Sequence, residues 1–120
     1  MLELRGISRR LGSFRLRGLD LRMAPDEYLV LMGPSGVGKT VLLEIVCGLL
    51  RPDRGRVLYD GEDVTATPPE RRRFALAYQD YALFPHLSAY DNIAYGLRAR
   101  RQPTQDVHRK VDSVAEQIGF

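Results

Sequence analysis

The sequence of 120 residues predicts an α/β fold, and three observations support this prediction. Residues 28–32 form a continuously apolar run, which is typical of a parallel strand buried on both faces. A glycine-rich loop follows, and residues 40–50 then carry apolar side chains at helical spacing. Residues 14–23 alternate apolar and polar side chains, as an antiparallel strand with one buried face does.

Two strands are predicted before the glycine-rich loop, at residues 2–7 and 14–23. Gly18 shifts the alternation of the second strand, which indicates a β-bulge. The helix after the loop is predicted to tolerate Gly48 and to end before Pro52, because proline cannot continue a helix.

Further strands and helices are predicted in the rest of the chain. Ser88 followed by Asp91 is typical of the residues that cap a helix N-terminus. Valines recur every three or four residues near the C-terminus, which indicates an amphipathic helix. The predicted elements are a strand at 56–59, a helical turn at 67–70, a second buried strand at 74–78, a helix from Ser88 to about Arg100 and a helix at 107–118.

Charge and cysteine content restrict the function classes. The formal net charge is +3, and the basic residues are scattered rather than aligned in a stripe, so no nucleic-acid partner is expected. The cluster Arg71–Arg73 is interpreted as a solvated turn, with a phosphate-binding patch as the alternative. The single cysteine, Cys47, favours a reducing compartment and is interpreted as a small core residue rather than a reactive thiol. No apolar run is long enough to cross a bilayer.

The loop at residues 33–40 matches the phosphate-binding pattern G-x-x-x-x-G-K-[ST]. Its glycines allow positive φ, so that successive N–H groups can point at a polyphosphate at a helix N-terminus. Lys39 is then expected to reach the β- and γ-phosphates, and the Thr40 hydroxyl to bind Mg²⁺. A dinucleotide fingerprint does not fit, because Val41 stands where that motif requires Gly or Ala. The nucleotide-binding residues predicted here are Gly33, Pro34, Ser35, Gly36, Val37, Gly38, Lys39 and Thr40.

Two longer segments resemble a known family. Residues 78–97, YQDYALFPHLSAYDNIAYGL, resemble the Q-loop region of ATP-binding cassette (ABC) proteins, and residues 48–65 are similar to that family's antiparallel subdomain. Within the family, residues 9–16 and 68–88 look most like importers of oxyanions such as molybdate or tungstate. The resemblance covers nearly the whole chain and implies a P-loop nucleoside triphosphatase fold.

The resemblance implies a division of the domain and further site residues. It places the antiparallel β-subdomain at 1–27 and 55–66, part of a RecA-like core at 28–54 and 74–79, and the Q-loop with the start of a helical subdomain at 80–120. It implies that Gln79 contacts the Mg²⁺ shell and links ATP binding and hydrolysis to the permease. It also implies an adenine-stacking aromatic. Leu11 occupies the position where the family has this aromatic residue. Phe14, the nearest aromatic residue, therefore either stacks on adenine in its place or belongs to the core.

The same resemblance implies partners and a location. They are ATP, membrane permease subunits and a second copy of the subunit, at the cytoplasmic face of the cell membrane. The Walker B carboxylates, the signature motif and the switch histidine of the family are not found. The chain is therefore expected to be the N-terminal part of a longer ATPase and to be inactive in hydrolysis by itself. A non-transport cassette ATPase and a non-catalytic nucleotide-binding remnant are the alternatives.

Overall fold

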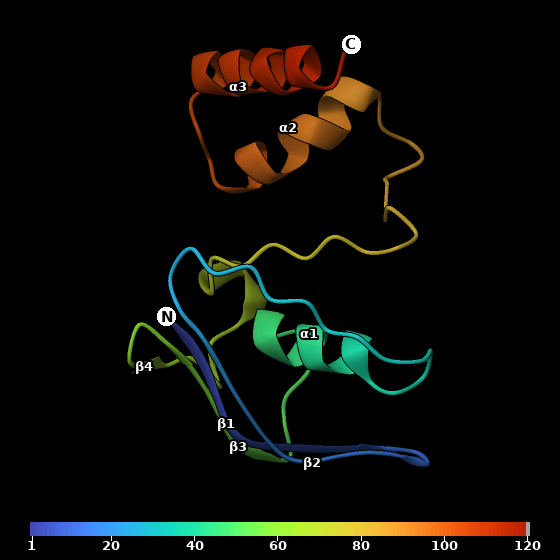
Figure 1. The fold of residues 1–120 in the computed structure, drawn as a ribbon. Helices are drawn as coiled ribbons and strands as arrows, with labels where there is room; N and C mark the ends of the chain where they lie inside the picture. Colours follow the sequence, from blue (N-terminus) through green and yellow to red (C-terminus); the bar gives the residue numbers. More distant parts are fainter. Residues whose placement is uncertain (120) are drawn as a thin grey trace. The chain divides into compact units, whose positions relative to one another are not determined.

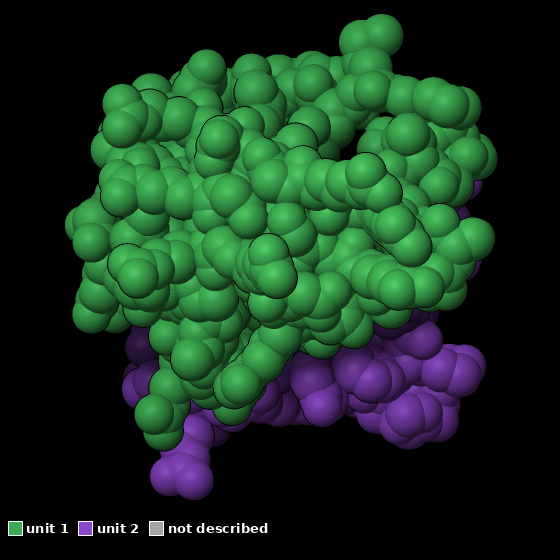
Figure 2. Space-filling view, turned by 90° about the horizontal axis from the view of Figure 1, so that it is seen from below, with its two compact units in different colours: residues 1–76 green, residues 77–120 purple. Residues whose placement is uncertain are grey.

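The computed structural model describes residues 1–119, and Figure 1 shows the order of its elements. The chain divides into two compact units, residues 1–76 and a second unit that begins at Ala77 (Figure 2). The glycine-rich loop belongs to the first unit and Gln79 to the second. We describe each unit by itself.

The first unit contains a four-stranded antiparallel sheet with the strand order β2-β1-β3-β4. Gly18, with φ of 55°, lies where the pairing of the first two strands shifts between Ile7 and Arg9, which confirms the predicted bulge. Both predicted N-terminal strands are present, and the first is longer than expected. The strands are β1 (Leu2–Leu11), β2 (Phe14–Met23), β3 (Arg54–Tyr59) and β4 (Glu62–Asp63).

The helix α1 (Lys39–Cys47) lies over one face of this sheet (Figure 1). Leu42 and Ile45 on α1 pack into one buried cluster with side chains from β1 and β3. Leu2, Leu16, Leu19 and Leu21 extend this core at its edge. The cluster attaches α1, and with it the loop that precedes the helix, to the sheet. The strand residues in it are Leu4, Ile7 and Val57.

The helix α1 ends three residues earlier than the sequence pattern predicted. Gly48 has φ of 85° and its N–H donates to the carbonyl oxygens of Glu44 and Ile45. Leu49 N also donates to Glu44 O, at 2.9 Å. A left-handed glycine with such bonds closes a helix, so the prediction that Gly48 is tolerated and Pro52 ends the helix was wrong.

Arg72 is buried, with 3% of its surface exposed, and holds the C-terminal end of α1. Its Nη1 donates to Ile45 O at 2.8 Å and to Val46 O at 3.0 Å, two carbonyl groups in the last turn of the helix, where helical hydrogen bonds run out. Its Nε and Nη2 donate to Thr67 O and Thr65 O, at 2.7 and 2.8 Å. The interpretation of this cluster as a solvated turn was therefore wrong for Arg72.

The two predicted core strands, residues 28–32 and 74–78, are not strands in this structure. Tyr28 is 91% exposed and Met32 is 88% exposed, so the first run is not buried on both faces. A strand exists only where its N–H and C=O groups bond to a neighbouring strand, and no described segment pairs with either run. Parts of both runs instead line an apolar hollow of about 270 Å³ beside α1, where Leu29, Leu31, Phe74 and Leu76 lie.

The predicted helical turn and both C-terminal helices are present. The turn is the 3₁₀ helix η1 (Pro69–Arg71) in the first unit. In the second unit, Ser88 caps α2 (Ala89–Ala99) by accepting from Asp91 N at 3.1 Å, and α3 (Thr104–Gln117) follows. Ala94 packs in a buried cluster with two valines of α3, Val107 and Val111. No helix in the described residues is long and apolar enough to cross a membrane.

Candidate nucleotide-binding site

The glycine-rich loop enters α1 through two glycines in the left-handed region. Gly36 has φ of 81° and Gly38 has φ of 97°, conformations that side chains disfavour. Gly33 is not in this region. Two of the three glycines in the loop are therefore required for the turn, and Gly38 also occupies the N-cap position of α1.

Backbone donors gather where the loop becomes a helix. The first helical bond of α1 runs from Leu42 N to Gly38 O, at 3.0 Å. Within residues 1–119, the N–H groups of Gly36, Gly38, Lys39 and Thr40 donate to no protein acceptor. No acidic side chain occupies the first turn of α1. The loop is therefore a set of unpaired N–H donors at the positive end of a helix, which fits an anion such as a phosphate.

Lys39 folds over the loop that it ends. Its Nζ donates to the carbonyl oxygens of Gly33 and Pro34, the latter at 3.3 Å. No carboxylate lies within 4.0 Å of this ammonium group in the described part of the chain. Its charge is balanced only by carbonyl dipoles and is available to a phosphate. Thr40, next along the helix, is exposed.

Phe14, at the start of β2, lies against the end of the loop. A Cβ atom built on Gly38 would lie 2.0 Å from Cζ of Phe14, so the ring packs directly on this glycine. The half-buried ring therefore belongs to the edge of the loop rather than to the central cluster of the sheet. Its contact with adenine stays a prediction.

Replacing Gly38 by alanine should lower ATP affinity more than replacing Gly36. Both substitutions strain a left-handed residue, but a Cβ at position 36 meets nothing within 4 Å, whereas at position 38 it meets the Phe14 ring. Calorimetric titration of the full-length variants with ATP measures the difference. Adding Phe14→Ala to Gly38→Ala should restore part of the loss. Equal losses in both single variants would contradict a role for this contact.

Gln79 is exposed and lies in a turn at the start of the second unit. Tyr81 N donates to Tyr78 O at 3.2 Å, and both Tyr81 and Ala82 have positive φ, at 63° and 48°. The predicted contact of Gln79 with the Mg²⁺ shell stays a prediction. The described residues include no group of three His, Cys, Asp or Glu side chains that could hold a metal ion. The metal-binding residues we expect remain Thr40 and Gln79.

Cys47, the last residue of α1, is partly buried. Burial raises the pKa of the Cys47 thiol, although the charge of Arg72 opposes this change. A raised pKa keeps the sulfur protonated at neutral pH, and the thiol is the unreactive form. The structure therefore favours the interpretation of Cys47 as a packing residue.

A phosphate-binding loop on a sheet-and-helix unit defines a P-loop nucleoside triphosphatase fold. The family model described as "ABC transporter" matches residues 16–120, and the chain belongs to this family. The chain is 50% identical over 120 residues to the molybdate/tungstate import ATP-binding protein WtpC of Pyrococcus horikoshii, covering 100% of this chain and 35% of that protein. It is 40% identical over 121 residues to the spermidine/putrescine import ATP-binding protein PotA of Mesoplasma florum, with the same coverages, 100% and 35%. The chain thus spans about a third of the length of these curated relatives.

Solved structures show the same fold. A dimeric ATP-binding cassette in a post-hydrolysis state, bound to ADP and Pi, matches with a TM-score of 0.81 at 22% sequence identity. The match covers 97% of this chain and 56% of the other. The predicted fold class, a P-loop cassette with an antiparallel sheet, is confirmed.

Proposed function

We propose that this chain forms the phosphate-binding part of an ATPase subunit that drives import of an oxyanion, such as molybdate or tungstate, through a membrane permease. One observation carries the phosphate-binding part of this proposal: unpaired N–H groups and the ammonium group of Lys39 converge at the N-terminus of α1, within a cassette fold. Such a loop recognises a polyphosphate by its charge and shape. The oxyanion part rests on the similarity to a molybdate/tungstate import protein.

The proposed division of labour combines the chemistry of the loop with the roles that the family resemblance implies for Gln79 and Phe14. The backbone amides and Lys39 would hold the β- and γ-phosphates, Thr40 and Gln79 would hold the Mg²⁺, and Phe14 would cover the adenine. Bound Mg²⁺ would neutralise charge on the phosphate oxygens. Transfer of a phosphoryl group to water depends on positioning and electrostatics rather than on a covalent intermediate. The partners we propose are permease subunits and a second copy of the subunit, at the cytoplasmic face of the membrane.

The substrate class is testable by reconstitution. The full-length subunit is combined with its permease in vesicles, and ATP-dependent uptake of tungstate, molybdate, sulfate and spermidine is compared. We expect saturable uptake of tungstate or molybdate, because the relative with 50% identity is named for these ions. Uptake of spermidine alone would refute the oxyanion proposal. ATP hydrolysis with no permease partner would favour the non-transport alternative, and failure to hydrolyse would favour a non-catalytic remnant.

Replacing Gln79 by alanine should reduce transport more than it reduces ATP binding. Gln79 is exposed at the start of the second unit, so its removal leaves no buried group unpaired. Uptake by the reconstituted transporter and ATP affinity of the isolated subunit are measured in parallel. Gln105→Ala, which changes another exposed glutamine, is the control and should alter neither. Equal loss of transport and affinity would make Gln79 a plain binding residue, and normal transport would remove it from the mechanism.

A further inference from the structure

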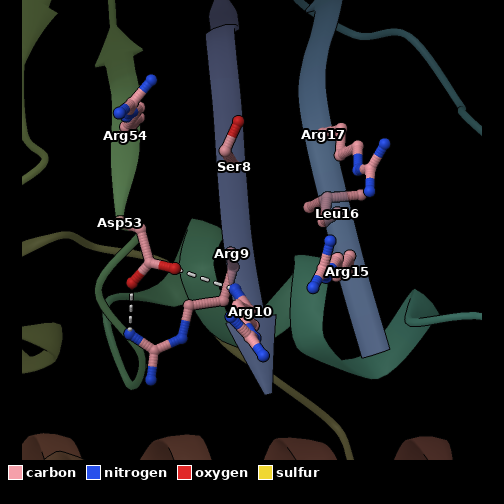
Figure 3. A pocket seen from close by; sticks show the side chains of 8 residues that line it. All are labelled: Ser8, Arg9, Arg10, Arg15, Leu16, Arg17, Asp53 and Arg54. Carbon is pink, nitrogen blue, oxygen red and sulfur yellow. Dashed lines mark hydrogen bonds and ion pairs between the residues drawn. The ribbon is translucent and has the colours of Figure 1, made fainter. Parts of the chain in front are cut away.

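A groove of about 420 Å³ on the sheet of the first unit is lined by five arginines (Figure 3). Leu16 on β2 packs toward the core under the sheet, and side chains alternate along a strand, so its neighbours Arg15 and Arg17 belong to the opposite face. Figure 3 shows the arginines of the groove on the neighbouring strands β1, β2 and β3, with α1 passing behind the strands. The lining consists of Ser8, Arg9, Arg10, Arg15, Leu16, Arg17, Asp53 and Arg54.

The only carboxylate in this lining is already occupied. Asp53 accepts from Arg9 Nη1 at 3.2 Å and from the backbone N–H of Arg10 at 2.8 Å. Among the described residues, no carboxylate lies within 4.0 Å of the guanidinium groups of the other four arginines. The groove therefore carries a local excess of positive charge.

The strand register brings like charges together. Arg10 on β1 is directly opposite Arg15 on β2, and Ser8 is opposite Arg54 on β3. Like charges directly opposite each other on an antiparallel pair destabilise the sheet. At the other end of the same sheet the arginines do have acidic partners: Glu3 bonds Arg5 at 2.7 Å and Arg22 at 3.4 Å. On this sheet, the arginines without a carboxylate partner among the described residues therefore all line the groove.

Arg9, directly opposite Leu16 in the strand register, donates from Nη1 to Arg51 O at 3.0 Å as well as to Asp53. Its Nε is the one buried side-chain nitrogen or oxygen without a hydrogen-bond partner in the described chain. Buried polar groups nearly always have a partner, and where the protein supplies none, a water molecule or a ligand does so. Guanidinium groups recognise phosphate through pairs of hydrogen bonds.

From these observations we propose that the groove binds a polyanion with neighbouring phosphate groups, of the diphosphate type, at a site separate from the phosphate-binding loop. The volume is within the range of ligand pockets, roughly 300–1,000 Å³. The lining contains no aromatic side chain, so it offers no surface on which a base could stack. The ligand is therefore recognised by its phosphates alone. A soluble diphosphate and the headgroup of an acidic phospholipid share this chemistry.

The test is calorimetric titration of the full-length protein with sodium pyrophosphate at about 0.15 M salt, where loose surface attraction is screened. All variants carry Lys39→Ala, which weakens the loop site. Arg10→Gln with Arg15→Gln should lower pyrophosphate affinity about tenfold or more, because charge-assisted contacts are lost. Arg56→Gln, on β3 but outside the groove, removes an exposed arginine and should leave the affinity unchanged.

Thermal unfolding, measured in the same Lys39→Ala background, supplies a second readout. Without pyrophosphate the double variant should unfold at the same temperature or higher, since a like-charge pair is relieved. Pyrophosphate should raise the unfolding temperature of the parent, which carries Lys39→Ala alone. It should not raise that of the variant that also carries Arg10→Gln and Arg15→Gln. Equal affinity in the double variant and Arg56→Gln, or no binding by the parent, would overturn the proposal. In a parallel arm, Arg10- and Arg15-dependent binding to phosphatidylglycerol vesicles would identify a lipid source, whereas binding of pyrophosphate alone would identify a soluble one.

Discussion

Replacing Lys39 by alanine is expected to weaken ATP binding by about 3–5 kcal/mol, which is roughly a hundredfold to a few thousandfold in Kd. The ammonium group has no carboxylate partner among the described residues and contacts only carbonyl oxygens of its own loop. Its loss therefore removes charge-assisted contacts to phosphate without leaving a buried charge unpaired. Calorimetric titration of the full-length protein with ATP gives the difference directly.

Two further variants make the Lys39 experiment specific. Lys110, the only other lysine, lies on α3 and bonds Gln102 Oε1 at 2.8 Å, so Lys110→Ala should leave ATP affinity unchanged. Lys39→Arg should not restore binding, because a planar guanidinium does not fit where a narrow ammonium group folds over a tight loop. Unchanged affinity in Lys39→Ala would refute the assignment of this loop as the nucleotide site.

Replacing Arg72 by methionine should destabilise the protein by about 3 kcal/mol or more, among the larger effects of a single substitution. Methionine fills a similar volume but leaves four carbonyl oxygens without their charged donor, two of them at the end of α1. Each unsatisfied buried group costs about 1–3 kcal/mol. The free energy of unfolding is measured by denaturant titration of the full-length protein.

The neighbouring arginine provides the control for this substitution. Arg71 is exposed, so Arg71→Met should change the free energy of unfolding by no more than about 0.5 kcal/mol. Arg72→Lys should recover only part of the loss, because one ammonium group cannot reach carbonyl oxygens on both sides of the site as the guanidinium fork does. Equal effects of Arg71→Met and Arg72→Met would show that burial of Arg72 does not matter for stability.

Sequence alone identified the features that depend on neighbours in the chain. The glycine-lysine pattern predicted the phosphate loop because positive φ and helix entry are local requirements, and Gly36 and Gly38 adopt this geometry. Ser88 and Asp91 predicted the start of α2, since a helix cap bonds within four residues. Periodicity placed α3, because its buried positions Val107 and Val111 lie one helical turn apart.

Features that depend on distant partners were decided only by the tertiary structure. Residues 28–32 have the composition of a buried strand, but backbone groups form a strand only where another strand accepts their hydrogen bonds. Arg71 and Arg72 are chemically identical neighbours, and only Arg72 is buried, because its guanidinium group reaches the carbonyl groups at the end of α1. Phe14 meets Gly38, and Arg10 faces Arg15, because strand pairing and the packing of α1 bring them together. Local sequence patterns reflect the hydrogen bonds that a segment makes within itself. The contacts of Phe14, Arg10 and Arg72 form only when distant segments pack together, so the stability of the whole fold determines them.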